Sequence, residues 1–487
     1  MMNKTLLFAA IFLSCSQVVA QPTLPQQPNI IIIMADDLGY GDLGSYNGVQ
    51  QTPNLDQLAR EGMRFTDFHS SGTVCSPTRA GLITGRYQHK TGVDGVVNAD
   101  PKHPSHGFGV DPKTQITFPN LVKAQGYKTA LFGKWHVGYQ ERFHPMNFGF
   151  DRFVGFLSGN IDYISHYDRM HTYDWWHDKK LVVEPGYSTQ LITKHAVDFI
   201  HDNKDTPFVL YVAHEAVHDP MQAPNSAIQR GPNKVKKDFS LDKTEIFKEV
   251  ITELDRSVGD IVKAVKLAGL SDKTLILFTS DNGPMKLSSP GPLRGKKGSL
   301  FEGGHRVPTI AWWPKVIKAN TVNEQLTISL DIMPTIIELT KAKLPNGHKL
   351  DGISLLPTLL SDDNIADSNL ANKKKPRELF WRNGGLNLRA TNLLTKDKAK
   401  AMRAGKWKLI VSPYYRNTSL YDLSQDLGEQ HNVAKKHPEI VKTMMAKVKA
   451  WQDEMLPFLP YKVLPYQLIA NKVIPDQLVP DKVMAQK

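Results

Sequence analysis

The segment Cys75-Ser76-Pro77-Thr78-Arg79 combines residue types that suit anion chemistry. Proline is favoured in the first turn of a helix, so the segment is predicted to open a helix with Cys75 at its N-terminus. Backbone N–H groups at a helix N-terminus stabilise negative charge, and Arg79 would follow one turn later. From these residues alone, Cys75 is a candidate low-pKa cysteine, and a buried, inert thiol is the general alternative.

Polar side chains also follow four short apolar runs that are rich in β-branched residues. Such runs are typical of buried parallel strands. They span Asn29–Met34, Lys128–Phe132, Phe208–Val212 and Thr274–Thr279. The polar residues after them are, in the same order, Asp36 and Asp37, Lys134 and His136, His214 and His218, and Asp281 and Asn282. Because open α/β sheets bind ligands beyond the carboxyl ends of their strands, we expect these distant segments to form one site.

Helical patterns lie between the predicted strands. One runs from Thr52 to Gly62 with Pro53 in its first turn, and a second covers roughly Leu241 to Ala268. Strands that alternate with helices indicate an α/β fold, here a large mostly parallel sheet sandwiched by helices. A predicted strand over Lys406–Val411 and a helix from about Pro438 to Met455 indicate a smaller C-terminal α+β domain.

Composition divides the chain into five predicted segments. Lys4 and a short apolar run precede small residues that end at Ala20, as in secretory signals. Prolines recur after residue 461 and prevent a regular helix there, so we expect an extended arm that packs on the body or joins a homo-oligomer. The segments are a signal peptide (1–20), a catalytic domain (21–360), a linker (361–376), a C-terminal domain (377–460) and the arm (461–487).

Net charge limits the classes of binding partner, and the cysteine count limits the possible disulfides. The 487 residues carry a net charge of +12, which suits an acidic partner. Export, to the periplasm or as a secreted protein, argues against nucleic acid and leaves an anionic lipid surface or an anionic polysaccharide; a basic solvated surface without a partner is the alternative. Beyond the N-terminus no apolar stretch reaches the roughly 18 residues that span a membrane. Cys15 and Cys75 are the two cysteines, so cleavage after Ala20 would leave Cys75 without a disulfide partner.

The segment from His214 to His218 reads His-Glu-x-x-His, the motif of zinc proteases. The motif binds zinc only on a helix, where both imidazoles share one face. Here it follows a predicted strand, and Pro220 comes two residues after the second histidine. We therefore predict that this segment is not helical and holds no zinc.

Taken together, these segments resemble the type I, formylglycine-dependent sulfatases of the alkaline-phosphatase-like superfamily, including bacterial polysaccharide sulfatases. Cys75-x-Pro77-x-Arg79 matches the family signature Cys-x-Pro-x-Arg, whose cysteine is oxidised to formylglycine during secretion. Thr73 departs from the small residue or proline usual at its position, and Phe132 is bulkier than usual. The other matching segments are 28–39, 126–136, 295–304 and 420–429.

The resemblance implies roles for particular residues. Asp36, Asp37, Asp281 and Asn282 would bind one metal ion with the modified Cys75 beside it. Oxygen ligands favour Ca²⁺ over zinc and leave Mg²⁺ open. Four residues would surround the sulfate: Cys75, Arg79, Lys134 and Lys297. His136 would be the base that allows sulfate to be expelled. His218 would be the acid that protonates the leaving alcohol. Ser158 would be a further sulfate contact. The implied maturation partner is a formylglycine-generating or anaerobic sulfatase-maturating enzyme.

Aromatic residues between 171 and 180 suggest a carbohydrate substrate. Trp175, Trp176 and His177 are predicted to stack on sugar rings; an ordinary surface loop is the alternative. An algal galactan such as carrageenan, or a glycosaminoglycan, fits the basic charge. Two other functions stay open: a phosphonate monoester or phosphodiester hydrolase of the same superfamily, and a non-catalytic glycan-binding protein on a sulfatase scaffold.

Overall fold

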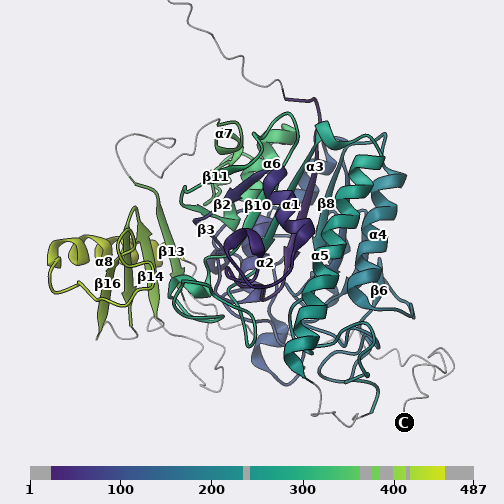
Figure 1. Cartoon of the computed structure of the whole chain (residues 1–487), viewed down its shortest axis with the longest axis horizontal. Coiled ribbons are helices and arrows are strands. Elements are labelled where there is room, and N and C mark those ends of the chain that lie inside the picture. Colours follow the sequence, from purple (N-terminus) through teal and green to yellow (C-terminus); the bar gives the residue numbers. More distant parts are fainter. Residues whose placement is uncertain (1–23, 234–241, 362–375, 383–398, 413–416, 456–487) are drawn as a thin grey trace, which may run out of the picture.

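The computed structural model describes residues 24–233, 242–361, 376–382, 399–412 and 417–455. The predicted signal peptide and C-terminal arm lie outside these ranges, as does nearly all of the predicted linker. The described residues form a large body with a central sheet and, beside it, a smaller sheet that carries one helix (Figure 1).

The four predicted strands form the centre of a ten-stranded sheet. They are β1 (Asn29–Ala35), β4 (Lys128–Lys134), β8 (Phe208–Ala213) and β9 (Thr274–Ser280), neighbours in the order β9-β1-β8-β4. All three pairings between them are parallel. Every residue of β1, β8 and β9 is buried, which explains why these strands are continuous apolar runs.

The sheet continues on both sides of this centre with strands that the apolar runs did not predict. β5 (Arg152–Phe156) pairs in parallel with β4, whereas β10 (Thr309–Trp312) is antiparallel to β9. The shorter strands are β2 (Met63–Phe65), β6 (Trp176–His177), β7 (Lys180–Leu181) and β11 (Thr321–Asn323), with β3 (Phe68–His69) and β12 (Thr327–Ile328) in a separate pair. The sheet is therefore mixed but mostly parallel, as predicted.

Helices cover both faces of the sheet. One face packs against α1 (Pro53–Glu61), α4 (Ser188–Asp202) and α5 (Lys243–Leu267), and the other against α2 (Cys75–Thr84), α3 (Phe118–Lys123), α6 (Ile332–Thr340) and α7 (Leu356–Leu359). Successive β1 side chains point to opposite faces, so Ile31 and Ile33 join the first core while Ile30 and Ile32 join the second. This confirms the predicted sandwich. Within the described ranges, no helix combines the length and the apolar composition that crossing a membrane would need.

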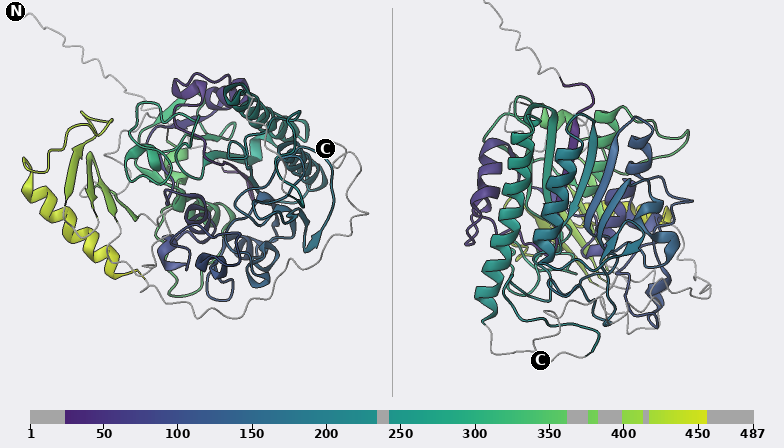
Figure 2. Two further views of the ribbon diagram at one scale, coloured as in Figure 1. Left: turned by 90° about the horizontal axis from the view of Figure 1, so that it is seen from below. Right: turned by 90° about the vertical axis from the view of Figure 1, so that its right-hand side faces the viewer.

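The smaller sheet is antiparallel and lies beside the main body. It contains β13 (Glu378–Arg382), β14 (Lys400–Ala404), β15 (Trp407–Val411) and β16 (Thr418–Asp422) in sequence order. α8 (Pro438–Asp453) packs on it through Met444, Val448 and Trp451. Figure 2 (left) shows α8 on the side of this sheet that faces away from the main body. The predicted C-terminal α+β unit is thus confirmed.

Candidate active site

The residues predicted to converge do so at one edge of the main sheet. Parallel strands present their carboxyl ends together, and the polar residues follow those ends. Asp36 and Asp37 come after β1, Lys134 ends β4, His218 lies in the turn after β8, and Asp281 follows β9. Ion pairs and hydrogen bonds connect residues from all four strand ends. The structure thus brings these residues from distant segments together, with the exception of His214.

Cys75 is the first residue of α2, as its neighbours predicted, and its side chain is buried. Sγ lies 3.5 Å from Oδ1 of Asp36 and 3.1 Å from Nζ of Lys297. The prediction of a low pKa is wrong for this thiol. Burial, followed by the carboxylates of Asp281 and Asp36, raises the pKa of Cys75 to about 12 despite the nearby lysines. The unmodified side chain therefore stays a neutral thiol at neutral pH.

Arg79 and Lys134 are buried and paired with carboxylates of the site. Arg79 donates from Nε to Oδ2 of Asp281 over 3.0 Å, and from Nη1 to the backbone carbonyl of Lys134 over 3.1 Å. The ammonium group of Lys134 pairs with Oδ2 of Asp36. Buried charges are tolerated when they are paired in this way. The pairing fixes two cations in the wall of the site.

Lys297 brings a third cation from the connection between β9 and β10. Its Nζ lies 2.5 Å from Oδ1 of Asp37 as well as 3.1 Å from Sγ of Cys75. Burial opposes the charge on Lys297, but the neighbouring negative groups, led by the carboxylate of Asp37, together outweigh burial and raise the pKa of Lys297 well above its usual range. Lys297 is therefore a fixed positive charge beside Cys75.

The acidic residues fit a divalent cation. Oδ2 of Asp37 and Oδ1 of Asn282 are buried acceptors without a hydrogen-bond donor among the described residues. The rest of the set is oriented by short contacts, since Asn282 donates to Oδ1 of Asp37 over 2.7 Å and the Asp37 N–H donates to Oδ1 of Asp281 over 3.3 Å. Unpaired buried acceptors are costly, and a hard cation would satisfy them. Asp36 completes a set whose side chains offer oxygen.

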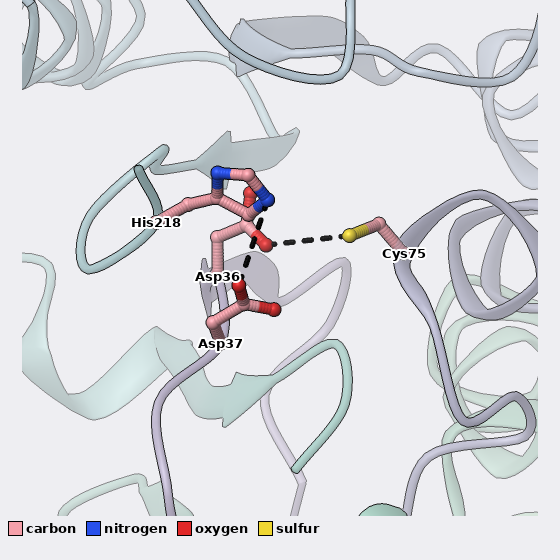
Figure 3. A group of neighbouring side chains, drawn as sticks. All are labelled: Asp36, Asp37, Cys75 and His218. Carbon is pink, nitrogen blue, oxygen red and sulfur yellow. Dashed lines mark hydrogen bonds and ion pairs between the residues drawn. The ribbon is translucent and has the colours of Figure 1, made fainter. Parts of the chain in front are cut away.

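Asp36 and Asp37 also face His218 and Cys75, as Figure 3 shows. One ligand atom from each of these four side chains lies within 4.8 Å of the others. An ion held by the carboxylates would therefore lie next to the residue at position 75, the arrangement that the resemblance implies.

His136 follows β4 with a left-handed backbone (φ 57°). Its Nε2 lies 2.9 Å from the carbonyl of Val97 and donates to it, and its Nδ1 has no partner within the described part of the chain. Burial, followed by the charge of Lys134, holds the pKa of His136 well below its usual range. The neutral ring thus offers Nδ1 as a proton acceptor.

His218 points its Nε2 at the acidic residues. That nitrogen lies 3.5 Å from Oδ2 of Asp37, while Nδ1 donates to the carbonyl of Asp219 over 2.7 Å. Asn160 lies 3.2 Å from the same Nδ1 through its side-chain amide, and Arg230 donates to Oδ1 of Asn160 over 2.8 Å. The sequence did not mark Asn160 or Arg230, because both lie in irregular segments that carry no motif.

His214 belongs to a different environment. Its Nε2 lies 2.8 Å from Oγ of Ser257 on α5, and burial lowers its pKa to about 3. The residues from His214 to His218 form no helix, as predicted. The two imidazoles of the His-Glu-x-x-His segment therefore have different partners, and only His218 faces the site.

Two of the three residues predicted to bind sugar, Trp175 and Trp176, lie in the interior. Trp175 and Trp176 are 0% and 7% exposed, and their Nε1 groups donate to Glu184 and Asp174 over 2.9 and 2.7 Å. Both indoles are packed into the protein, so the structure does not support the predicted stacking on sugar rings. His177 is half-buried, and its Nε2 lies 2.8 Å from Oε2 of Glu184.

Ser158 is also buried, in the connection after β5. Its Oγ donates to the carbonyl of Asn160 over 3.1 Å, and its N–H donates to the carboxylate of Asp174 over 2.8 Å. Gly159 follows directly and packs against the ring of His136. Ser158 thus lies close to the site, with its hydroxyl engaged by the backbone.

A model of the sulfatase family matches residues 28–342, and a model of the C-terminal region of N-sulphoglucosamine sulphohydrolase matches residues 296–454. The chain is a member of the sulfatase family of sulfuric ester hydrolases. The resemblance found in the sequence is confirmed.

Individual relatives agree with this assignment. Human arylsulfatase A is 34% identical over 93% of this sulfatase and 92% of its own length. N-acetylgalactosamine-6-sulfatase of Rattus norvegicus is 35% identical over 69% of this chain, and the match spans 66% of the rat enzyme. Among solved structures, Ps i-CgsB superposes with a TM-score of 0.75 at 30% identity and covers 88% of this chain and 93% of its own. These matches confirm the alkaline-phosphatase-like fold.

Proposed function

We propose that this sulfatase hydrolyses sulfate esters of a carbohydrate, using a formylglycine matured from Cys75 and one divalent metal ion. The observation that carries the proposal is the set of three fixed cations, Arg79, Lys134 and Lys297, around a buried cysteine beside Asp36. A sulfate ester needs its negative charge neutralised before a nucleophile can approach sulfur. The three cations supply that charge at the N-terminus of α2.

The names of similar proteins support two classes of glycan as the substrate. One crystal structure of Ps i-CgsB holds k-i-k-neocarrahexaose, which supports an algal galactan such as carrageenan. The name N-acetylgalactosamine-6-sulfatase supports a glycosaminoglycan. We propose that the chain is exported, secreted or to the periplasm, and is matured there or on the way by a formylglycine-generating or anaerobic sulfatase-maturating enzyme.

The chain's own residues would bind the ester and move its protons. Arg79, Lys134 and Lys297 hold the sulfate, and His218, in its doubly protonated form, gives the proton of Nε2 to the leaving sugar oxygen. His136 accepts a proton at Nδ1 when sulfate is released. Hydrated formylglycine supplies two geminal hydroxyls, one for attack on sulfur and one for release of the product. Ca²⁺ bound by the acidic residues would supply further stabilisation of negative charge.

Paired substrates test the reaction class. The matured enzyme should turn over aryl sulfates and sulfated oligosaccharides faster than phosphonate monoesters or phosphodiesters. A preference for the phosphorus esters would instead assign it to the alternative hydrolases of the superfamily. Binding of sulfated glycans without any turnover, after maturation at position 75 has been verified, would identify a glycan-binding protein on a sulfatase scaffold.

Removal of the metal should lower both stability and activity. Without the metal ion, Oδ2 of Asp37 and Oδ1 of Asn282 remain buried acceptors that no donor among the described residues satisfies. An ion present at 100 times its Kd stabilises the fold by about 2.7 kcal/mol, so chelation should lower Tm by several degrees and Ca²⁺ should restore it. Differential scanning calorimetry and an aryl sulfate assay, with Mg²⁺ in a parallel titration, measure both effects.

Two variants control the metal experiment. Asp37→Asn should remove the response of Tm to Ca²⁺, whereas Asp260→Asn, an exposed position on α5, should keep it. An Asp37→Asn enzyme with unchanged activity and chelator sensitivity would refute the assignment of the metal ligands.

The connection that carries Lys297 ends in an ion-pair network with the C-terminal sheet. The carboxylate of Glu302 lies 3.0 Å from Nη1 of Arg403 and 2.8 Å from Nζ of Lys408, and all three side chains are buried. Glu429 accepts the Glu302 N–H at Oε2 over 2.7 Å. The C-terminal sheet therefore fixes the chain five residues after Lys297.

Loss of one partner in this network should displace Lys297. Lys408→Met leaves the buried charge of Glu302 with one partner fewer, a change that typically costs about 3–5 kcal/mol. We expect a lower urea midpoint and a lower kcat/KM per folded molecule. Lys406→Met removes an exposed pair with Asp422 and should cost less than about 1 kcal/mol. Reduced stability with unchanged kcat/KM would show that the network does not position Lys297.

A further inference from the structure

A second group of metal-ligating side chains lies at the β6 edge of the main sheet. His177 ends β6, Glu184 lies in the connection after β7, and His195 is on α4. Nε2 of His177 is 2.8 Å from Oε2 of Glu184, and Nε2 of His195 is 2.9 and 3.1 Å from Oε1 and Oε2. One ligand atom from each residue lies within 4.8 Å of the other two. The group shares no residue with the candidate active site.

The surroundings hold these three side chains in place. Trp175 donates from Nε1 to Oε2 of Glu184 over 2.9 Å, and this hydrogen bond orients the carboxylate. The rings of His177 and His195 meet edge to face at 5.2 Å, and the ring of His195 packs 6.0 Å from that of Phe132. Buried donors of this kind are what orient ligands around bound metals.

The three side chains are accessible to solvent, and Glu184 carries the negative charge that suits a metal ion. The side chains of His177, Glu184 and His195 are 28%, 19% and 16% exposed, so an ion and a water molecule can reach them. Burial opposes ionisation of Glu184, but hydrogen bonds from His177, His195 and Trp175 outweigh it and hold the pKa of Glu184 well below its usual range. The carboxylate is therefore an anion that faces two imidazoles.

We propose that His177, Glu184 and His195 form a binding site for Zn²⁺ or a similar divalent transition-metal ion. Two imidazole nitrogens and one carboxylate are a ligand set that zinc accepts, with a water molecule in the fourth position. The candidate active site differs, because its aspartates and asparagine offer oxygen and suit Ca²⁺ or Mg²⁺. The ion would tie the edge strand β6 to α4 and so act on stability. This proposal does not depend on the proposed function.

Metal titration of the full, tag-free chain tests the site. The protein is stripped with chelator, returned to excess Ca²⁺ to fill the active site, and titrated with Zn²⁺ by calorimetry. We expect one equivalent of Zn²⁺ to bind and Tm to rise by roughly 2–4 °C at 100 times the Kd. Co²⁺ in place of Zn²⁺ should give the intense visible absorption of a four-coordinate ion, which an oxygen-only site does not give.

Matched variants decide between the sites. Glu184→Gln and His195→Gln should each weaken Zn²⁺ binding by at least about 100-fold, since loss of an outer partner alone typically costs 10–100-fold. His201→Gln, an exposed histidine on the same helix, and Asp37→Asn should bind Zn²⁺ as the unchanged protein does. Circular dichroism verifies that each variant is folded.

Three results would overturn the proposal. They are the absence of Zn²⁺ binding in the presence of Ca²⁺, binding that Glu184→Gln and His195→Gln both retain, and binding that Asp37→Asn abolishes. In the first case the three residues form only a hydrogen-bonded link between β6 and α4.

Discussion

Replacing Cys75 with alanine is expected to abolish sulfate ester hydrolysis and to leave the fold intact. Loss of a catalytic nucleophile typically costs about 10⁴–10⁶ in rate. Cys75 is a small residue at the start of α2, and within the described residues its Sγ hydrogen-bonds to Asp36 and Lys297 alone, so alanine should fit its place. Steady-state assays on an aryl sulfate and a thermal melt measure the two effects. Cys15→Ala, the same substitution within the predicted signal peptide, should leave turnover unchanged.

Mass spectrometry of the peptide that contains position 75 distinguishes a modified residue from a plain thiol. In the active enzyme the peptide should have lost one sulfur and two hydrogens and gained one oxygen, the exchange that converts cysteine to formylglycine. Thiol reagents added after denaturation should then fail to label it. Full labelling of a fully active preparation would mean that the enzyme works with an unmodified cysteine, and the proposed chemistry would be wrong.

The central strands, and the polar residues that meet at their carboxyl ends, could be predicted because short stretches of sequence indicate both. β1, β8 and β9 are buried on both faces, so they read as unbroken apolar runs. Parallel pairing then brings the residues after these strands to one edge, which is why Asp36 and Asp281 could be placed together before any contact was known.

Predictions failed where the deciding partner is distant in sequence. The helix N-terminus suggested a low pKa for Cys75, but the carboxylates of Asp36 and Asp281 come from β1 and β9, and burial adds to their effect. Trp175 and Trp176 stand among polar residues and read as a surface loop. Carboxylates accept their indole N–H groups, which allows both rings to be buried without an unpaired donor.

The ion pair between Glu302 and Lys408 could not be predicted either, because its two residues are also far apart in the sequence. The two residues are separated by more than 100 positions, and each looks like an ordinary surface charge in its own segment. Only the packing of the C-terminal sheet against the main body reveals that both are fully buried. Motifs can thus place Lys297, the proposed sulfate-binding lysine, on a segment without showing what holds that segment.

Replacing His218 with alanine should affect two classes of substrate differently. Its Nε2 faces Asp37, and Nδ1 donates its hydrogen to the carbonyl of Asp219, so His218 acts as an acid in its doubly protonated form and gives the Nε2 proton to a leaving oxygen. General acid catalysis is typically worth about 10² to 10⁴ in rate. A sugar alkoxide leaves poorly without a proton, whereas a phenolate leaves unaided. We therefore expect a loss of that size on a sulfated oligosaccharide and a smaller one on an aryl sulfate.

His214→Ala is the matched control, because it removes the other histidine of the same short segment. His214 contacts Ser257, whose hydroxyl also accepts from Thr193 over 2.6 Å, so the loss of His214 removes one of two hydrogen bonds of that hydroxyl at a cost of about 0.5–1.5 kcal/mol. Both substrates should then be affected alike, through the amount of folded enzyme. Measuring kcat/KM and Tm for both variants on both substrates separates the roles. Equal losses of His218→Ala on the sugar and aryl esters would show that His218 is not the acid for the leaving group.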